Sequence, residues 1–105
     1  MFTGIVEAVG EVVEVGRRGD VVRIVVDEQA LAAAVALGDS VAVNGTCLTI
    51  AEADPTRLHF DAIPETMQKT SLGTLAAGSP VNLERAMRAE GSLQLPIAES
   101  NRDEE

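Results

Sequence analysis

Short, evenly spaced runs of β-branched residues, separated by turn residues, are the feature that most constrains the fold of this 105-residue chain. Segments 5–15 and 21–26 are rich in Val and Ile, and Arg-Arg-Gly-Asp at 17–20 marks a turn between them. Residues 57–63 alternate between apolar and polar side chains, and 79–87 forms a last run of this kind. Several short strands with turns between them predict a small closed or nearly closed antiparallel barrel.

Two further segments favour short helices. Residues 28–37 are rich in alanine and begin with an acidic residue, which suits a helix that Gly38 would end. Residues 65–72 favour a short helical turn ended by Gly73. Pro64, between the strand at 57–63 and this turn, is expected to close the strand because proline cannot donate to a ladder.

The segment around Asn44-Gly45 allows two interpretations. Residues 40–43 and 47–51 both have strand character, so the two residues between them form either a tight hairpin turn or a bulge in one long strand. Because each flank is short and Thr46-Cys47 continues the β pattern, the sequence favours the bulge.

Composition disfavours several classes of function. The net charge of −9 argues against nucleic-acid binding, and Phe2 and Phe60 are the only aromatic residues on which bases could stack. A single cysteine, Cys47, cannot form an internal disulfide, which fits a cytoplasmic location. No apolar run approaches the roughly 18 residues of a membrane span, and no Cys and His cluster has zinc-ligand spacing. We therefore expect neither a membrane protein nor a metal site.

Four motifs together point to a family. They are Met-Phe-Thr-Gly-Ile-Val at 1–6, Asn-Gly-Thr-Cys-Leu-Thr at 44–49, Glu65-Thr66 with Thr-Ser-Leu-Gly at 70–73, and Val-Asn-Leu-Glu-Arg-Ala at 81–86. In this order and spacing, residues 1–87 resemble the N-terminal half of riboflavin synthase.

The resemblance implies an all-β fold, a small six-stranded antiparallel Greek-key barrel with one or two short helices. It places this barrel at residues 1–88 and leaves 89–105 as an irregular acidic tail. The family's enzyme carries two such barrels in tandem and converts two molecules of 6,7-dimethyl-8-ribityllumazine into riboflavin and a diaminopyrimidine. Its active site lies between the N-terminal barrel of one subunit and the C-terminal barrel of another, so each barrel holds one lumazine.

The resemblance also implies a ligand site in which exposed strand backbone matches the pyrimidinedione edge of the ring. Gly4 would let the ring approach the backbone, and the hydroxyls of Thr49 and Thr66 would donate or accept hydrogen bonds to the ligand. Asp61 and Glu65 would accept hydrogen bonds from the ribityl hydroxyls. The implied contacts are Gly4, Ile5, Val6, Cys47, Leu48, Thr49, Asp61, Ala62, Ile63, Pro64, Glu65 and Thr66. Cys47 would serve as a nucleophile only in an active enzyme, and His59 is expected on the surface of its strand.

After Ala86 the chain carries neither the Gly-Gly-His connector of the family nor a second copy of the motifs. It is therefore expected to be a one-barrel relative or the first barrel of a longer protein. The first hypothesis is a binding module for riboflavin, FMN or 6,7-dimethyl-8-ribityllumazine that requires no cofactor and associates as a homodimer or homotrimer. The alternatives are riboflavin synthase activity in an oligomer or a full-length enzyme, and an interaction barrel without a ligand.

Overall fold

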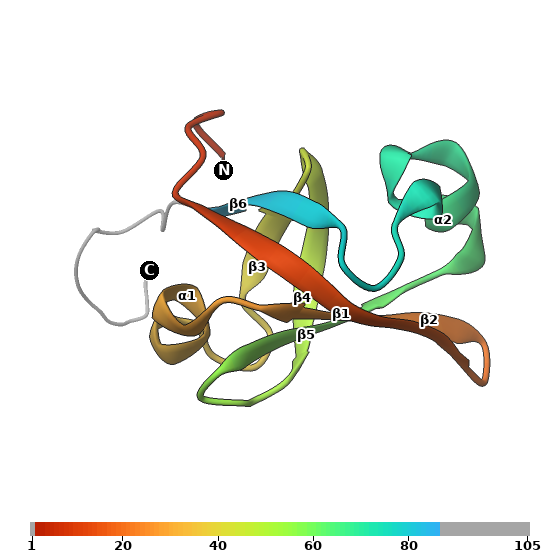
Figure 1. Ribbon diagram of the computed structural model, residues 1–105, viewed down its shortest axis with the longest axis horizontal. Coiled ribbons are helices and arrows are strands. Elements are labelled where there is room, and N and C mark those ends of the chain that lie inside the picture. Colours follow the sequence, from red (N-terminus) through yellow and green to blue (C-terminus); the bar gives the residue numbers. More distant parts are fainter. Residues whose placement is uncertain (1, 87–105) are drawn as a thin grey trace, which may run out of the picture.

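A computed structural model of the chain describes residues 2–86. Six antiparallel strands close into a barrel in the order β1-β2-β5-β4-β3-β6, as Figure 1 shows. The strands are β1 (Ala8–Arg18), β2 (Val21–Asp27), β3 (Ser40–Val43), β4 (Thr46–Glu52), β5 (Arg57–Ala62) and β6 (Pro80–Arg85). The predicted all-β class and the six-stranded barrel are confirmed, whereas the predicted tail at 89–105 lies outside the described residues.

The strand order is that of a Greek key. β3, β4 and β5 are consecutive neighbours, while β2 lies beside β5 and β6 lies beside β3. The two long connections carry the helices: α1 (Gln29–Ala34) precedes β3, and α2 (Pro64–Lys69) with the 3₁₀ helix η1 (Ser71–Thr74) precedes β6. Figure 1 shows α1 and α2 at opposite ends of the barrel. No helix within residues 2–86 has both the length and the apolar character needed to cross a bilayer.

Alternation along the strands fills the barrel interior. On β5, Leu58, Phe60 and Ala62 are buried, and on β6 Val81 and Leu83 are buried between exposed or outward-facing neighbours. Burial of each large apolar side chain contributes about 1.5–3 kcal/mol. The core consists of Val12, Ile24, Val26, Leu31, Ala32, Val41, Val43, Leu48, Ile50, Leu58, Phe60, Ala62, Leu72, Val81 and Leu83.

The bulge favoured at Asn44-Gly45 is wrong, because these residues form the turn of a tight β3–β4 hairpin. Val43 pairs with Thr46, and both turn residues have positive φ, 50° for Asn44 and 85° for Gly45. A two-residue turn of this kind matches the twist of the flanking strands and favours Asn-Gly. A register shift occurs instead in β1, between residues 12 and 14.

The helices begin and end at residues other than the predicted ones. α1 begins after Glu28, whose carboxylate accepts a hydrogen bond from the Leu31 N–H (2.9 Å), and ends at Ala34 rather than at Leu37. Tertiary hydrogen bonds compete with the last predicted turn, since the Gly38 N–H donates to the Ile50 carbonyl. In the second segment, Pro64 opens α2 instead of only closing β5, and Gly73 lies within η1.

Gly10 gives a direct test of barrel packing. A Cβ added there would lie 2.6 Å from Val26 Cγ1 and 3.0 Å from Leu83 Cδ1, both on fully buried side chains. We expect Gly10→Ala to lower the free energy of unfolding by about 1–3 kcal/mol because the core is overpacked. At Gly16 on the same strand the nearest atom, Glu14 Oε2, is 3.8 Å away, so Gly16→Ala should leave stability unchanged or raise it by up to about 1 kcal/mol.

Urea unfolding followed by far-UV circular dichroism measures both variants. Equal losses of stability in the two would contradict the packing assigned to Gly10.

Candidate functional site

β4 and β5 pair over only part of their length. Their ladder contains the pairs Ile50–Phe60 and Glu52–His59, with a register shift between them. Residues 46–49 of β4 pair with β3 on one side, and no pairing with β5 joins them on the other side within residues 2–86. We call residues 46–49, with the facing residues 61–63, the open edge.

The peptide groups of Cys47 and Thr49 face the open edge. Val43 and Thr46 flank a two-residue turn and therefore form a hydrogen-bonded pair. Pair types alternate along an antiparallel ladder, so the backbone groups of Cys47 and Thr49 point away from β3, toward β5. Both side chains are exposed. A flat heterocycle with donors and acceptors along one edge can dock against such a row of peptide groups.

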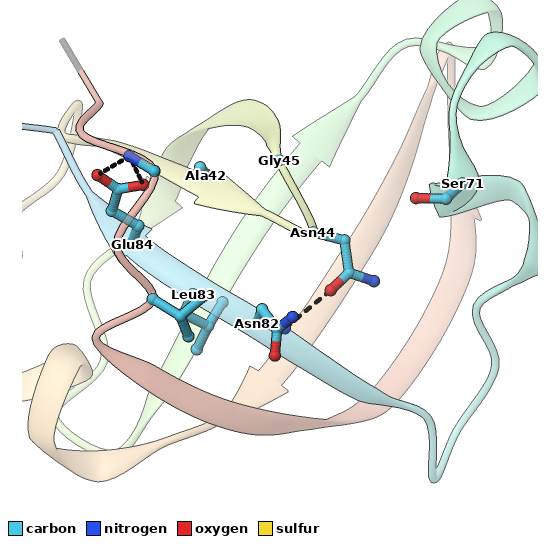
Figure 2. A pocket seen from close by; sticks show the side chains of 9 residues that line it. Ala42, Asn44, Gly45, Ser71, Asn82, Leu83 and Glu84 are labelled. Carbon is cyan, nitrogen blue, oxygen red and sulfur yellow. Dashed lines mark hydrogen bonds between the residues drawn. The ribbon is translucent and has the colours of Figure 1, made fainter.

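A pocket of about 310 Å³ lies next to the open edge, on the outer surface of β3 and β6 (Figure 2). Ala42 connects the two features, because it pairs with Glu84 of β6 on one side and with Cys47 of β4 on the other. The lining residues come from the N-terminal segment, the β3–β4 turn, η1 and β6: Gly4, Val6, Ala42, Asn44, Gly45, Ser71, Asn82, Leu83 and Glu84.

Asn44 holds one end of the pocket in place. Its backbone N–H donates to the Asn82 carbonyl (2.9 Å), and its side-chain Oδ1 accepts from the Asn82 N–H (2.8 Å). The second of these bonds is drawn in Figure 2. Together they extend the β3–β6 pairing into the turn, where a backbone at positive φ could not continue the regular ladder. The turn is thus fixed to β6.

Glu84 anchors the N-terminal wall of the pocket. Glu84 is only 8% exposed. Its carboxylate accepts hydrogen bonds from the Thr3 N–H (2.5 Å), the Thr3 hydroxyl (2.9 Å) and the Gly4 N–H (3.1 Å). The next strand residue, Arg85, pairs with Glu7 at 3.1 Å. The side-chain hydrogen bond from Arg85 is the main cause that lowers the pKa of Glu7. Two carboxylates therefore fasten residues 3–7 to β6.

The structure brings the first two predicted segments together. Gly4 and Val6 line the pocket, and Cys47 lies one strand away from it on the same outer surface. Ile5 is 68% exposed, and Thr49 is exposed on the open edge. Cys47 is therefore not the buried small apolar residue that a lone cysteine most often is.

The third predicted segment leads from β5 into α2. Leu48 and Ala62 are buried in the core, so they offer a ligand their backbone rather than their side chains. Ile63, between β5 and α2, is 53% exposed. Pro64 begins α2, and the carbonyl of Thr66 accepts a hydrogen bond from the Thr70 hydroxyl (2.7 Å).

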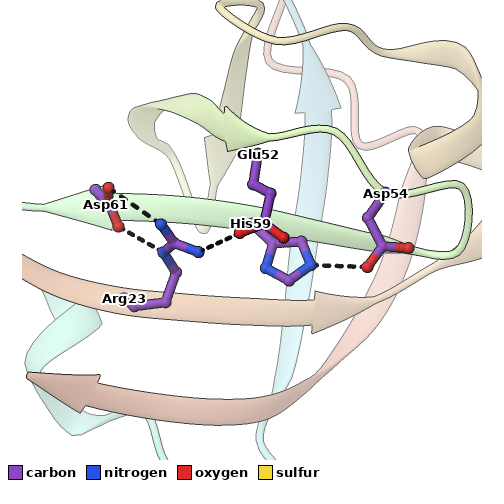
Figure 3. Close-up of polar contacts among 5 residues, drawn as sticks. All are labelled: Arg23, Glu52, Asp54, His59 and Asp61. Atoms are coloured by element: carbon purple, nitrogen blue, oxygen red, sulfur yellow. Dashed lines mark hydrogen bonds and ion pairs between the residues drawn. The ribbon is translucent and has the colours of Figure 1, made fainter. Parts of the chain in front are cut away.

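The two predicted carboxylates already have cationic partners. Asp61 binds Arg23 (Nε–Oδ1 2.6 Å), and the same guanidinium binds Glu52 at 2.9 Å (Figure 3). Arg23 is buried, whereas the side chains of Asp61 and Glu52 are 33% and 52% exposed, so the carboxylates still reach the solvent. Glu65 pairs with Lys69 at 2.9 Å on the exposed face of α2, where such pairs contribute about 0.3–0.5 kcal/mol.

His59 is less exposed than predicted. Its side chain is 14% exposed, and Nε2 lies 2.8 Å from Asp54 Oδ2, while Nδ1 is buried without a hydrogen-bond partner in the described chain (Figure 3). The pKa of Asp54 is lowered from 3.8 to about 2, first because the Thr56 N–H donates to its carboxylate and second because of His59. Leu58 and Phe60 both point inward, which leaves His59 on the outer face beside this turn.

Sequence reasoning missed most of the pocket. Asn82 and Glu84 alternate with buried Val81 and Leu83, so their polar side chains were readable as an outward pair on one strand. Ala42 and Ser71 carried no signal of this kind, since small residues are common on both faces of strands and in turns. Residues 2–86 contain no group of three or more His, Cys, Asp or Glu side chains that could hold a metal ion.

Comparison with known proteins agrees with this geometry. Residues 3–86 match the family described as the lumazine binding domain. The chain belongs to this family. It is 43% identical over 91 residues to the riboflavin synthases of Actinobacillus pleuropneumoniae and Bacillus subtilis. The aligned region covers 87% of this chain but 42% of each relative, so the chain spans less than half the length of these enzymes.

Solved structures of LumP have the same fold. LumP complexed with 6,7-dimethyl-8-(1'-D-ribityl) lumazine superposes with a TM-score of 0.73 and 28% identity, covering 85% of this chain and 49% of LumP. LumP with riboflavin gives a TM-score of 0.71 at 29% identity, covering 81% and 46%. LumP with flavin mononucleotide gives 0.72 at 28% identity, covering 81% and 49%.

The anchoring role of Glu84 is testable by Glu84→Gln. An amide offers one acceptor oxygen and brings an NH₂ group toward N–H donors, so the N-terminal wall should detach. We expect faster hydrogen exchange at the Gly4 and Ile5 amides, measured by NMR, and a loss of about 1.5–3 kcal/mol in the free energy of unfolding. Glu11→Gln, an exposed position on β1, should change neither quantity. Unchanged exchange at Gly4 in Glu84→Gln would contradict this role.

Asp54 predicts a specific acid sensitivity. Because its pKa is lower in the folded protein than the ordinary 3.8, the ionised carboxylate stabilises the fold above about pH 4, and this contribution is lost as pH falls toward about 2. Thermal unfolding of the native protein and of Asp54→Asn should therefore show a difference in Tm at pH 6 that closes toward pH 2. A difference that stays constant over this range would refute the assignment.

Proposed function

We propose that this lumazine-binding domain binds one riboflavin-type ligand, namely riboflavin, FMN or 6,7-dimethyl-8-ribityllumazine, at the open edge and the adjoining pocket. The observation that carries the proposal is that the peptide groups of Cys47 and Thr49 point toward β5, where no pairing within residues 2–86 takes them up, beside a pocket of about 310 Å³. Family membership and the three LumP complexes support this choice of ligand.

The ring would lie against the open edge. Peptide groups of Cys47 and Thr49 supply donors and acceptors for a pyrimidinedione edge without a charged side chain. Exposed Ile63 provides an apolar contact on the β5 side. Gly4 lines the pocket side, and because glycine has no side chain, a ligand can reach its backbone directly; its φ of 85° is one that other residues rarely adopt.

The ribityl chain would form hydrogen bonds with polar side chains at and beside the open edge. Thr49 and Thr66 offer hydroxyls, and Glu65 is an exposed carboxylate that can accept from the chain despite its pair with Lys69. Asp61 keeps its position through Arg23, and a carboxylate has lone pairs left for a ligand hydroxyl after such a pair forms.

Riboflavin synthase activity is the second candidate, supported by the relatives at 43% identity. That reaction needs two lumazine rings held together in one orientation, and positioning supplies much of its rate. One barrel holds one ring, so the activity requires a second barrel, either from a further part of a longer chain or from a second copy in a homodimer or homotrimer. We also propose a cytoplasmic location, which the single free cysteine, Cys47, fits because the cytoplasm keeps thiols reduced.

Fluorescence titration tests ligand binding. The fluorescence of riboflavin should be quenched in a saturable way when purified protein is present. Thr49→Val should weaken the affinity of the protein for riboflavin about tenfold, because it removes one hydrogen-bonding hydroxyl. Thr56→Val is the matched control, since it makes the same change in the turn between β4 and β5, outside the open edge and the pocket, and should leave the affinity within about twofold.

Absence of quenching by both riboflavin and 6,7-dimethyl-8-ribityllumazine up to high micromolar concentration would refute ligand binding and favour an interaction barrel. Incubation with the lumazine, followed by absorption spectroscopy, separates the two candidates. Sustained formation of riboflavin would show that the protein is an enzyme rather than a binder alone.

A further inference from the structure

The N-terminal wall of the pocket is attached to the barrel by few contacts. Glu7 is fixed to β6, because its N–H donates to the Leu83 carbonyl (2.8 Å). We call the residues before it, 2–6, the N-terminal strap. Within residues 2–86, the strap backbone forms no hydrogen bond to the backbone of another segment, and none of its side chains packs against the core. Its attachment therefore depends on hydrogen bonds to side chains.

One carboxylate provides these hydrogen bonds. Glu84 accepts from the Thr3 N–H, the Thr3 hydroxyl and the Gly4 N–H, and Figure 2 shows its carboxylate beside the strap. The Thr3 hydroxyl also accepts from the Ile5 N–H (3.2 Å), and Gly4 between them has a φ of 85°. Successive N–H groups beside a residue with positive φ form a concave site for an anion. In this protein the carboxylate of Glu84 occupies that site.

A segment held in this way has a docked and an undocked state. Residues 3–6 are exposed, and Ile5 is the most exposed large apolar residue of the strap. Segments with few buried apolar contacts open locally at a small cost in free energy. The docked strap contributes Gly4 and Val6 to the pocket, whereas the undocked strap contributes no wall. Docking therefore determines whether the pocket is complete.

We infer that Glu84 is a positioning residue of the proposed ligand site, which raises the affinity for the ligand by holding the strap docked. The inference rests on the proposed function, in which the ligand contacts the backbone of Gly4. When only the docked state binds fully, the apparent dissociation constant equals the intrinsic constant divided by the docked fraction. Binding in turn favours the docked state, because the two equilibria are linked.

A double-mutant cycle tests the inference through riboflavin affinity, measured by fluorescence quenching. Glu84→Gln removes the charged acceptor, and Thr3→Pro removes the N–H and hydroxyl donors of Thr3. Each change removes hydrogen bonds to a charged group, so each should weaken riboflavin binding about tenfold. Because both act on the same docking step, the double variant should bind within about twofold of the weaker single variant. Two independent losses would multiply to about a hundredfold.

Hydrogen exchange and two controls separate positioning from a general loss of stability. Exchange at the Gly4 amide, measured by NMR, should be faster in all three variants, and saturation with riboflavin should slow it in the native protein. Glu11→Gln makes the same chemical change as Glu84→Gln at an exposed position of β1. Asp54→Asn weakens the turn between β4 and β5, outside the pocket. Both controls should leave riboflavin affinity within about twofold.

The outcomes separate this inference from the proposed function. If the native protein binds neither riboflavin nor the ribityl lumazine, the proposed function and the inference are both wrong. Native-like affinity in Thr3→Pro, despite faster exchange at Gly4, would refute the positioning role and leave ligand binding intact. This variant changes an exposed residue outside the strands, so it decides the question even if Glu84→Gln does not fold. A hundredfold loss in the double variant would overturn the inference by assigning Glu84 a direct ligand contact.

Discussion

The two-residue turn at Asn44-Gly45 determines which side chains of β4 face the core and which face the open edge. Side-chain direction alternates along a strand, so a change of one residue in this turn would exchange Cys47 and Thr49 with Leu48 and Ile50. The observed register puts the two apolar residues in the core and leaves the two polar ones exposed. The hydrogen bonds between Asn44 and Asn82 hold this register against β6. Core packing and site geometry thus depend on the same turn.

Ion pairs between side chains connect the strands where the backbone hydrogen bonds between β4 and β5 stop. The pairing of β4 with β5 stops at Ile50, and close to this point Arg23 on β2 binds Asp61 on β5 and Glu52 on β4. One guanidinium therefore links three neighbouring strands through side chains (Figure 3). The fixed planar fork of arginine suits this role better than the flexible ammonium of lysine. Arg23 thus connects the strands beside the open edge, where the backbone ladder between β4 and β5 is missing.

The barrel could be predicted from sequence because its determinants are local. Runs of Val and Ile with alternating burial, together with Gly and Pro at turns, specify short antiparallel strands, and the motifs supplied their order. The bulge predicted at Asn44-Gly45 is wrong because the positive φ that Asn-Gly favours is a stronger signal for a tight turn than short flanks are for a bulge. The pocket was largely missed because its walls come from residues about 80 positions apart, such as Thr3 and Glu84, and a single sequence does not show such contacts.

Asp61 shows why a carboxylate's function cannot be read from its position in a motif. The sequence places it at the end of an alternating strand, where it is equally suited to bind a ligand hydroxyl or to remain solvated. The structure gives it a largely buried arginine, which orients the carboxylate and cancels its charge. A carboxylate held in this way acts on a ligand as a fixed, nearly neutral acceptor. Glu52 and Glu84 hold Arg23 and the N-terminal segment in place in a similar way, although the motifs did not include either residue in the site.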